Sequence, residues 1–173
     1  ISTGKSPAGV AIDTKRDIAV VTNEKEDTVS IIDLENYSVI ATVSVGRSPH
    51  GIAVNTGNGT AILTNEKGDT ITVIDLDRNT VTTSINVSKK PISIAVDSDT
   101  SRVVIASSKD DIISIIDLTT NTITSTIHVG KDIKGIALNP VTNIALITNH
   151  KDNTLTLLDI DSLAVTNTIF TGE

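Results

Sequence analysis

A stretch of about 42 residues is repeated four times along this chain of 173 residues, with no gap between the copies. One aspartate stands at the same place in each copy, at Asp33, Asp75, Asp117 and Asp159. An aliphatic residue recurs in the same way, at Val10, Ile52, Ile94 and Ile136. Repeats of this length are typical of arrays in which each copy forms one supersecondary unit. The repeat therefore predicts four equal units, at about 4–45, 46–87, 88–129 and 130–171.

Each copy contains four short aliphatic or alternating runs separated by turn residues, which in the first copy are 9–13, 18–23, 28–33 and 38–44. The first two runs are apolar on consecutive residues, as expected for strands that are covered on both faces. The fourth run is more polar and alternates. The connecting segments are short enough for hairpins. No segment shows an amphipathic stripe with helix caps, so we predict essentially no helix.

Four short antiparallel strands whose polarity rises from first to fourth predict a propeller blade. The innermost strand of such a blade lies near the ring axis, and the outermost strand meets solvent. The predicted fold class is therefore all-β: a β-propeller with four four-stranded antiparallel blades of about 42 residues. The alternative is a β-solenoid, whose coils are usually shorter and lack this hairpin rhythm.

The composition indicates the size of the ring. Hydrophobic residues make up 38% of the chain but aromatic residues only 1%, so the core consists of Ile, Val, Leu and Ala. Blades in a small ring meet at steep angles and need bulky side chains between them. In addition, the chain begins and ends at a joint between copies, at Gly4 and Gly172. We therefore expect four blades of a larger ring, seven- or eight-bladed, completed by further sequence or by self-association.

Three motifs resemble the YVTN family of β-propeller repeats, which is named for Tyr-Val-Thr-Asn at the end of the second strand. Residues 20–23 read Val-Val-Thr-Asn, and residues 63–65 read Leu-Thr-Asn. A Gly-x-x-Pro joint at 4–7 and 46–49, with an Ile-Asp ending of the third strand, extends the match over nearly the whole chain. The resemblance implies a propeller similar to those of surface-layer and cell-envelope proteins, located outside the cell or in the envelope.

The copies depart from this pattern at a few positions. The third copy has Ser88 in place of the joint glycine and Ala106-Ser107 in place of Thr-Asn. The fourth copy has Ile133 where the others have proline, and the initial Tyr of the motif is absent from all four copies. These departures concern local detail and leave the predicted fold unchanged.

The charge and residue types exclude several classes of function. The formal net charge of −7 argues against a general nucleic-acid binder, because the phosphate backbone demands a basic surface. The absence of cysteine excludes disulfides, thiol catalysis and thiolate metal sites. No apolar run approaches the length of a membrane span.

Eight of the fourteen lysines and arginines occupy two equivalent sets of loop positions. One set precedes the first strand of each copy and contains Lys5, Arg47, Lys89 and Lys131. The other follows the second strand and contains Lys25, Lys67, Lys109 and Lys151. Both loops of a propeller blade emerge on one face, so we expect a ligand-binding surface there for an anionic glycan or a protein. Acidic residues stand beside the second set, and the alternative is a face of solvated or ion-paired loops.

The repeated polar residues have a structural interpretation. A carboxylate at the end of the third strand accepts backbone N–H bonds from the following turn, and we expect this of the four repeated aspartates. We expect Asn23, Asn65 and Asn149 to bond turn backbone in the same way. The three histidines occupy three different repeat positions, so no metal site is predicted, because metal ligands must converge on one point.

The predicted inner strands carry aliphatic residues and offer no gathering of acids, histidines or arginines near the axis. We therefore predict no catalytic residues, no cofactor and no enzymatic activity from these four blades. The favoured function is a non-catalytic extracytoplasmic propeller module that acts as a scaffold or binding surface in the cell envelope. The alternatives are a segment of a lactonase- or oxidoreductase-like propeller enzyme with its catalytic residues elsewhere, and an intracellular interaction ring, which the scarcity of aromatic residues disfavours.

Overall fold

The computed structural model describes residues 1–172 as four sheets of four antiparallel strands, each in sequence order. The first blade contains β1 (Pro7–Asp13), β2 (Ile18–Asn23), β3 (Thr28–Asp33) and β4 (Ser38–Ser44). The second contains β5 (Pro49–Asn55), β6 (Thr60–Asn65), β7 (Thr70–Asp75) and β8 (Thr80–Asn86). The third contains β9 (Pro91–Asp97), β10 (Arg102–Ser107), β11 (Ile112–Asp117) and β12 (Thr122–His128). The fourth contains β13 (Ile133–Asn139), β14 (Ile144–Asn149), β15 (Thr154–Asp159) and β16 (Ala164–Phe170).

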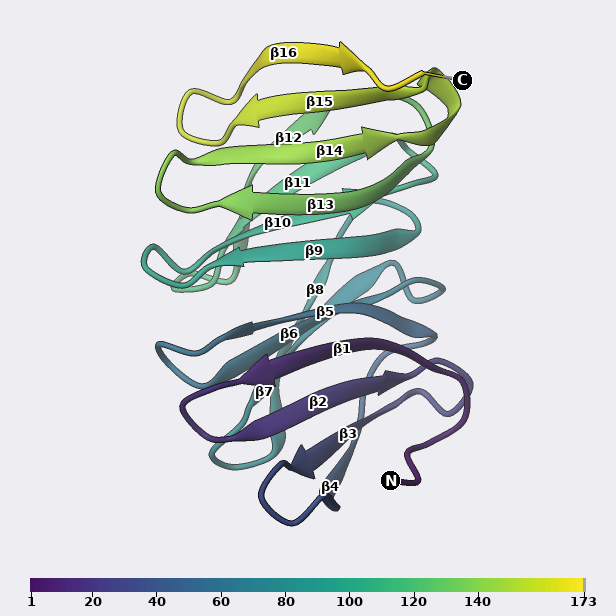
Figure 1. Ribbon diagram of the computed structural model, residues 1–173, viewed down its shortest axis with the longest axis vertical. Coiled ribbons are helices and arrows are strands. Elements are labelled where there is room, and N and C mark those ends of the chain that lie inside the picture. The colour runs from purple at the N-terminus through teal and green to yellow at the C-terminus, as the bar shows by residue number, and fades with distance from the viewer. Residues whose placement is uncertain (173) are drawn as a thin grey trace.

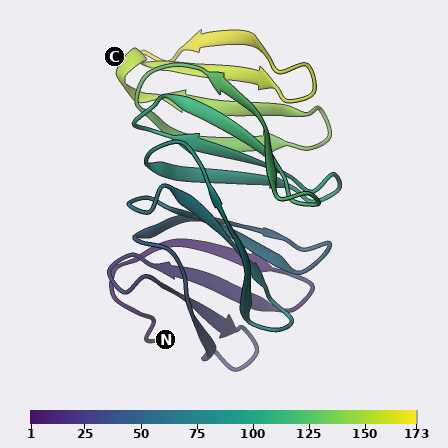
Figure 2. The same ribbon diagram turned by 180° about the vertical axis from the view of Figure 1, so that it is seen from behind.

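The blades fan out around the line of their inner strands. Figure 1 shows β1, β5, β9 and β13 side by side, with the first blade extending toward one end of the molecule and the fourth toward the other. Figure 2 shows from behind how the two middle blades extend away from these inner strands. The arrangement is an open arc of propeller blades and not a solenoid. A single 3₁₀ turn, η1 (His150–Asp152), is the helical element within residues 1–172.

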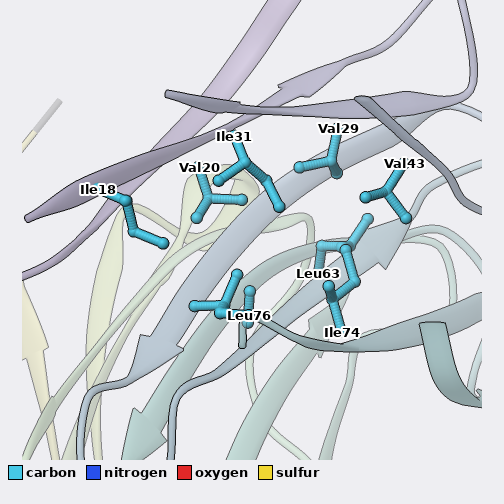
Figure 3. Close-up of a cluster of buried hydrophobic side chains, with 9 residues drawn as sticks. Ile18, Val20, Val29, Ile31, Val43, Leu63, Ile74 and Leu76 are labelled. Atoms are coloured by element: carbon cyan, nitrogen blue, oxygen red, sulfur yellow. The ribbon is translucent and has the colours of Figure 1, made fainter. Parts of the chain in front are cut away.

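The core consists of aliphatic layers between neighbouring blades. In Figure 3, Val20 and Ile31 of the first blade point toward Leu63 and Ile74 of the second, and all four side chains are fully buried. A second layer joins the second and third blades and a third joins the third and fourth. Removing this surface from water contributes about 25 cal/mol per Å² of apolar area. Each blade is therefore stabilised chiefly by its neighbours.

The loops are as regular as the strands. Each of the sixteen loops and joints holds one residue at a positive φ between 52° and 69°, fifteen of them non-glycine. Most of these residues are Asp, Asn or Ser, and Asn and Asp tolerate this left-handed conformation best among non-glycine residues. Three positions carry larger side chains in this conformation, Tyr37, Lys90 and Leu163. Loop geometry is thus repeated even where the residue type is not.

The repeated polar residues follow the expectation in one case and depart from it in another. The third-strand aspartates accept N–H bonds from their turns: Asp33 Oδ1 lies 2.8 Å from the amide of Glu35 and 3.0 Å from that of Asn36. The prediction for the asparagines is wrong. Asn23 Nδ2 donates to the hydroxyl groups of Thr28 and Ser30, at 3.1 and 2.9 Å, because it points across to the next strand and not into the turn.

Candidate functional site

The two predicted sets of cations lie on adjacent loops at one face of the arc, which we call the loop face. It is formed by the joints that precede each inner strand and by the loops between the second and third strands of each blade. The Lys25 amide donates to the Lys5 carbonyl at 3.2 Å, and the Lys67 amide donates to the Arg47 carbonyl at 3.3 Å. The joint and the loop of each blade are therefore hydrogen-bonded neighbours, and we call this pair of segments the ledge of that blade.

All eight loop-face cations are exposed to solvent. Within residues 1–172, two of them lie close to a carboxylate: Lys5 Nζ is 3.9 Å from Glu26, and Lys67 Nζ is 3.8 Å from Glu24 of the preceding blade. Such exposed pairs contribute little, typically below about 1 kcal/mol. The other six have no ion pair within 4.0 Å among the described residues, so their side chains remain accessible to a ligand.

The loop-face carboxylates are largely engaged by backbone amides. Asp27 Oδ1 accepts from the Ser48 amide at 2.7 Å, across the boundary between the first and second blades. Asp69 accepts from the Lys90 amide at 2.9 Å at the next boundary, and Asp111 repeats the contact on the third blade. These carboxylates hold neighbouring blades in register. Their negative charge is directed toward the protein, whereas the cationic side chains extend into solvent.

A cluster of three interacting side chains lies on the fourth blade at this face. Lys134 Nζ lies 2.8 Å from Asp132 Oδ1, and His150 Nδ1 lies 3.1 Å from Asp132 Oδ2. The hydrogen bond from Lys134, followed by that from His150, lowers the pKa of Asp132. Asp132 therefore stays ionised at neutral pH and is suited to a structural role and not to proton transfer.

An open groove of about 420 Å³ lies beside the fourth blade, at the edge of the loop face. Its walls include His128, Asp152, Thr168 and the exposed ring of Phe170. Phe170 is the only phenylalanine in the chain and is 82% exposed. The equivalent positions of the other copies are not Phe, Tyr or Trp, so the repeat does not mark Phe170, although a lone phenylalanine in an aliphatic chain is a signal in the sequence.

Arginine–aspartate contacts join neighbouring blades at the opposite face, and the repeat pattern does not indicate them. Arg16 binds Asp77 of the second blade in a two-pronged contact, at 2.7 and 2.9 Å, and also reaches Asp13 at 3.1 Å. Arg102 binds Asp161 of the fourth blade at 2.7 Å. The hydrogen bond from Arg16 lowers the pKa of Asp77. These arginines lie at different repeat positions, so alignment of the copies conceals their shared role.

Two features are absent from the part of the chain that the structure describes, a metal-ligand cluster and a membrane-spanning helix. Within residues 1–172 no three His, Asp or Glu residues are arranged to hold a metal ion. In the same part of the chain, no helix has the length and apolar character needed to cross a bilayer. Chemically, the described surface is suited to holding anionic or hydroxylated groups through its exposed cations.

Comparison with known proteins supports the fold and leaves the family open. No protein-family model matches the chain, and no curated protein matches its sequence. Among solved structures, 1324 chains match, one of which is hydrazine synthase from Kuenenia stuttgartiensis, with a TM-score of 0.87 and 18% sequence identity. The match covers 96% of this chain and 49% of that protein, so this chain spans about half its length. The fold is thus a propeller-type array shared by many proteins.

Proposed function

We propose that this chain is a non-catalytic propeller module that binds an anionic glycan or an acidic protein surface through its loop face. The observation that carries the proposal is the repeated ledge: eight exposed cations in two adjacent rows, on a chain whose net charge is −7. A local concentration of cations on an otherwise acidic protein attracts anions to that face. The groove with Phe170 adds an aromatic platform on which a sugar ring can pack.

The cellular location belongs to the same proposal. The Val-Thr-Asn strand ending and the Gly-x-x-Pro joint resemble YVTN repeats, and this resemblance supports a place in the cell envelope or outside the cell, as a scaffold or binding module. Fractionation of cells that produce the protein, followed by immunodetection, tests the location. Recovery in the cytoplasmic fraction alone would contradict it.

Binding is tested with polygalacturonate as an acidic glycan, poly-glutamate as an acidic polypeptide and dextran as a neutral control. We expect saturable binding of at least one polyanion by isothermal titration calorimetry, weakening as salt is raised because exposed charges are screened. The test variant carries Lys25→Gln, Lys67→Gln, Lys109→Gln and Lys151→Gln together. A control variant carries Lys15→Gln and Arg78→Gln, which remove two cations outside the loop face.

Loss of polyanion binding in the loop-face variant, with binding retained in the control, supports the proposal. Equal binding by both variants would show that the loop face is not the site. A propeller enzyme segment is the alternative, and the structural neighbour is itself named as a synthase. Turnover of a lactone or of a redox substrate by the isolated chain would favour that alternative.

A further inference from the structure

The outer face of the fourth blade is exposed at positions that are buried or half-buried in the other blades. Val20 of the first blade is fully buried against the second blade, whereas Leu146, the equivalent residue 126 positions later, is 38% exposed. Val43 is 8% exposed, whereas the equivalent Ile169 is 45% exposed. The fourth blade therefore has the apolar side chains of a blade junction without a blade to cover them.

The outer face of the first blade is uncovered in the complementary way. Val10 and Ile12 are 66% and 53% exposed, although Ile94, equivalent to Val10 on the third blade, is only 9% exposed. Behind them lies a small aliphatic cluster of Ala19, Val21 and Ile32, with Leu34 packed against it. These positions are equivalent to those that the second blade uses to pack against the first. The two end faces are thus the two halves of one junction.

A glycine on the fourth blade identifies what is missing there. Gly9 and Gly51 lie where an added Cβ would meet backbone of the next blade, and for Gly51 the Ile92 carbonyl oxygen would be 2.6 Å away. The equivalent Gly135 has only the Thr148 hydroxyl near it, at 3.4 Å. Nothing in one copy of the chain requires glycine at this position. β9 already lies beside β13 on one side, with Ser93 at this repeat position, whereas an inner strand on the other side of β13 would lie against Gly135 as β5 lies against Gly9.

Polar contacts alternate from junction to junction. The first and third junctions each have an arginine–aspartate contact, made by Arg16 and Arg102. The second junction has no such pair among the described residues. There Asn55 Nδ2 donates to the Ser98 carbonyl of the third blade at 3.4 Å. The residue at this position alternates along the chain, as Asp13, Asn55, Asp97 and Asn139.

This alternation predicts which contact the fourth blade would make. Asn139 is exposed and is equivalent to Asn55. If another blade followed the fourth, the Asn139 side-chain amide would donate to the backbone carbonyl at the position equivalent to Ser98. In the first blade that residue is Thr14. An asparagine-type junction between a fourth and a first blade continues the alternation, which closes without a mismatch in a ring with an even number of blades.

We propose that two copies of this chain associate head to tail, each fourth blade packing on the first blade of the other copy, to close a ring of eight blades. A head-to-tail contact closes into a ring when its rotation permits and otherwise forms an open filament. The occupant in this proposal is a second copy, because Val10 and Ile12 of one copy would cover Leu146 and Ile169 of the other. This association is independent of what binds the loop face.

Native mass spectrometry and light scattering of the purified chain test the ring. We expect a species of twice the 18.1 kDa mass of one chain, with no larger assemblies. A chain that stays at 18.1 kDa at every concentration overturns the proposal, and further blades of a longer polypeptide would then be the candidates for these faces. A ladder of larger species also overturns it, because the contact would then not close.

Two substitutions separate this interface from any other mode of association. Leu146→Lys places an unpaired charge in both junctions of the ring, and we expect the dimer dissociation constant to rise about 100-fold or more. Gly135→Ala leaves one copy unstrained but meets the Ala8 carbonyl of the second copy, and we expect a rise of about tenfold or more. Circular dichroism should show that both variants remain folded.

The matched control is Ile123→Lys. Ile123 is 39% exposed, close to the value for Leu146, but lies on the third blade and belongs to neither end face. We expect this variant to dimerise as the parent chain does. A dimer that survives both Leu146→Lys and Gly135→Ala would be formed by another surface, and the proposal would be wrong.

Discussion

The second and third blades each contact the next blade at the same repeat position, but with different residues and hydrogen bonds. On the second blade, Gly51 donates its amide to the Thr64 hydroxyl at 2.9 Å, and a side chain on Gly51 would collide with the next inner strand. On the third blade, glycine is replaced by Ser93 and threonine by Ala106. Ser93 Oγ then accepts the Ile136 amide of the fourth blade at 3.1 Å. The hydroxyl group that forms the hydrogen bond is thus on the second strand of the second blade, in Thr64, but on the inner strand of the third blade, in Ser93.

A second exchange occurs at the joint of the same two blades. On the second blade, a Cβ added to Gly46 would lie 2.5 Å from Cγ of the Asn65 side chain. On the third blade the pair is Ser88 and Ser107, and Ser107 Oγ donates to the Ser88 carbonyl at 3.0 Å. Because Ser107 is smaller than Asn65, the joint position of the third blade has room for Ser88 in place of glycine. The departures of the third blade from the repeat pattern are therefore coupled pairs and not independent changes.

The largest expected effect comes from alanine at the inner-strand position. Gly51→Ala should lower the free energy of unfolding by about 2–3 kcal/mol, because the new Cβ would meet the backbone of β9, which cannot move without its blade. The matched change on the third blade, Ser93→Ala, removes one hydrogen bond and should cost about 1 kcal/mol. Urea denaturation of both variants measures the difference. Equal losses would show that the two junctions do not differ as described.

The next prediction concerns the joint and tests whether the residues at positions 46 and 65 are energetically coupled. Gly46→Ser alone should destabilise the protein by about 1–3 kcal/mol, because the added side chain overlaps Asn65. Adding Asn65→Ser imports the pair found on the third blade and should restore at least about 1 kcal/mol of this loss. A double-mutant cycle on unfolding free energies measures the interaction. Strict additivity of the two changes would show that the exchange seen between blades is accidental.

These pairs mark the limit of what the sequence predicts. The 42-residue period predicts the strands and their order because every copy repeats the same aliphatic positions. The placement of Lys25 beside Lys5 also follows from the repeat, since both loops leave the blade on one face. By contrast, the partner of Ser88 lies 19 residues away on another strand, and the chain pattern does not show that the two touch. Arg16 and Arg102 are hidden for the related reason that they occupy different repeat positions.

A pH-dependent difference is expected between the same two blades at the first-strand end. The second blade has Asn55 there, and the third has buried Asp97. Burial raises the pKa of Asp97, but hydrogen bonds from Thr100 and from the turn amides outweigh it and leave the pKa below its usual value. A carboxylate with a lowered pKa in the folded state stabilises the protein above its unfolded pKa, about 3.9, and this stabilisation is lost on further acidification.

The Asp97→Asn variant, which carries the residue found at the equivalent position of the second blade, tests whether Asp97 stabilises the fold at neutral pH. Between pH 7 and about pH 3, the melting temperature of the parent chain should fall more than that of Asp97→Asn, because the variant has one carboxylate fewer to protonate. Thermal unfolding monitored by circular dichroism over this pH range makes the comparison. Parallel profiles for Asp97→Asn and the parent chain would contradict the assignment.

The smallest effect extends the comparison to the fourth blade, at the turn before its last strand. The second and third blades have Asn79 and Asn121 in the left-handed conformation there, whereas the fourth blade has Leu163 at a φ of 59°. Asparagine adopts this conformation at lower cost than leucine, whose Cβ lies too close to the following carbonyl oxygen. Leu163→Asn should therefore stabilise the fold by about 0.5–1 kcal/mol. Leu163→Ala keeps the Cβ and should give no such gain, so urea denaturation of the two variants separates backbone strain from the loss of a side chain that is 41% exposed.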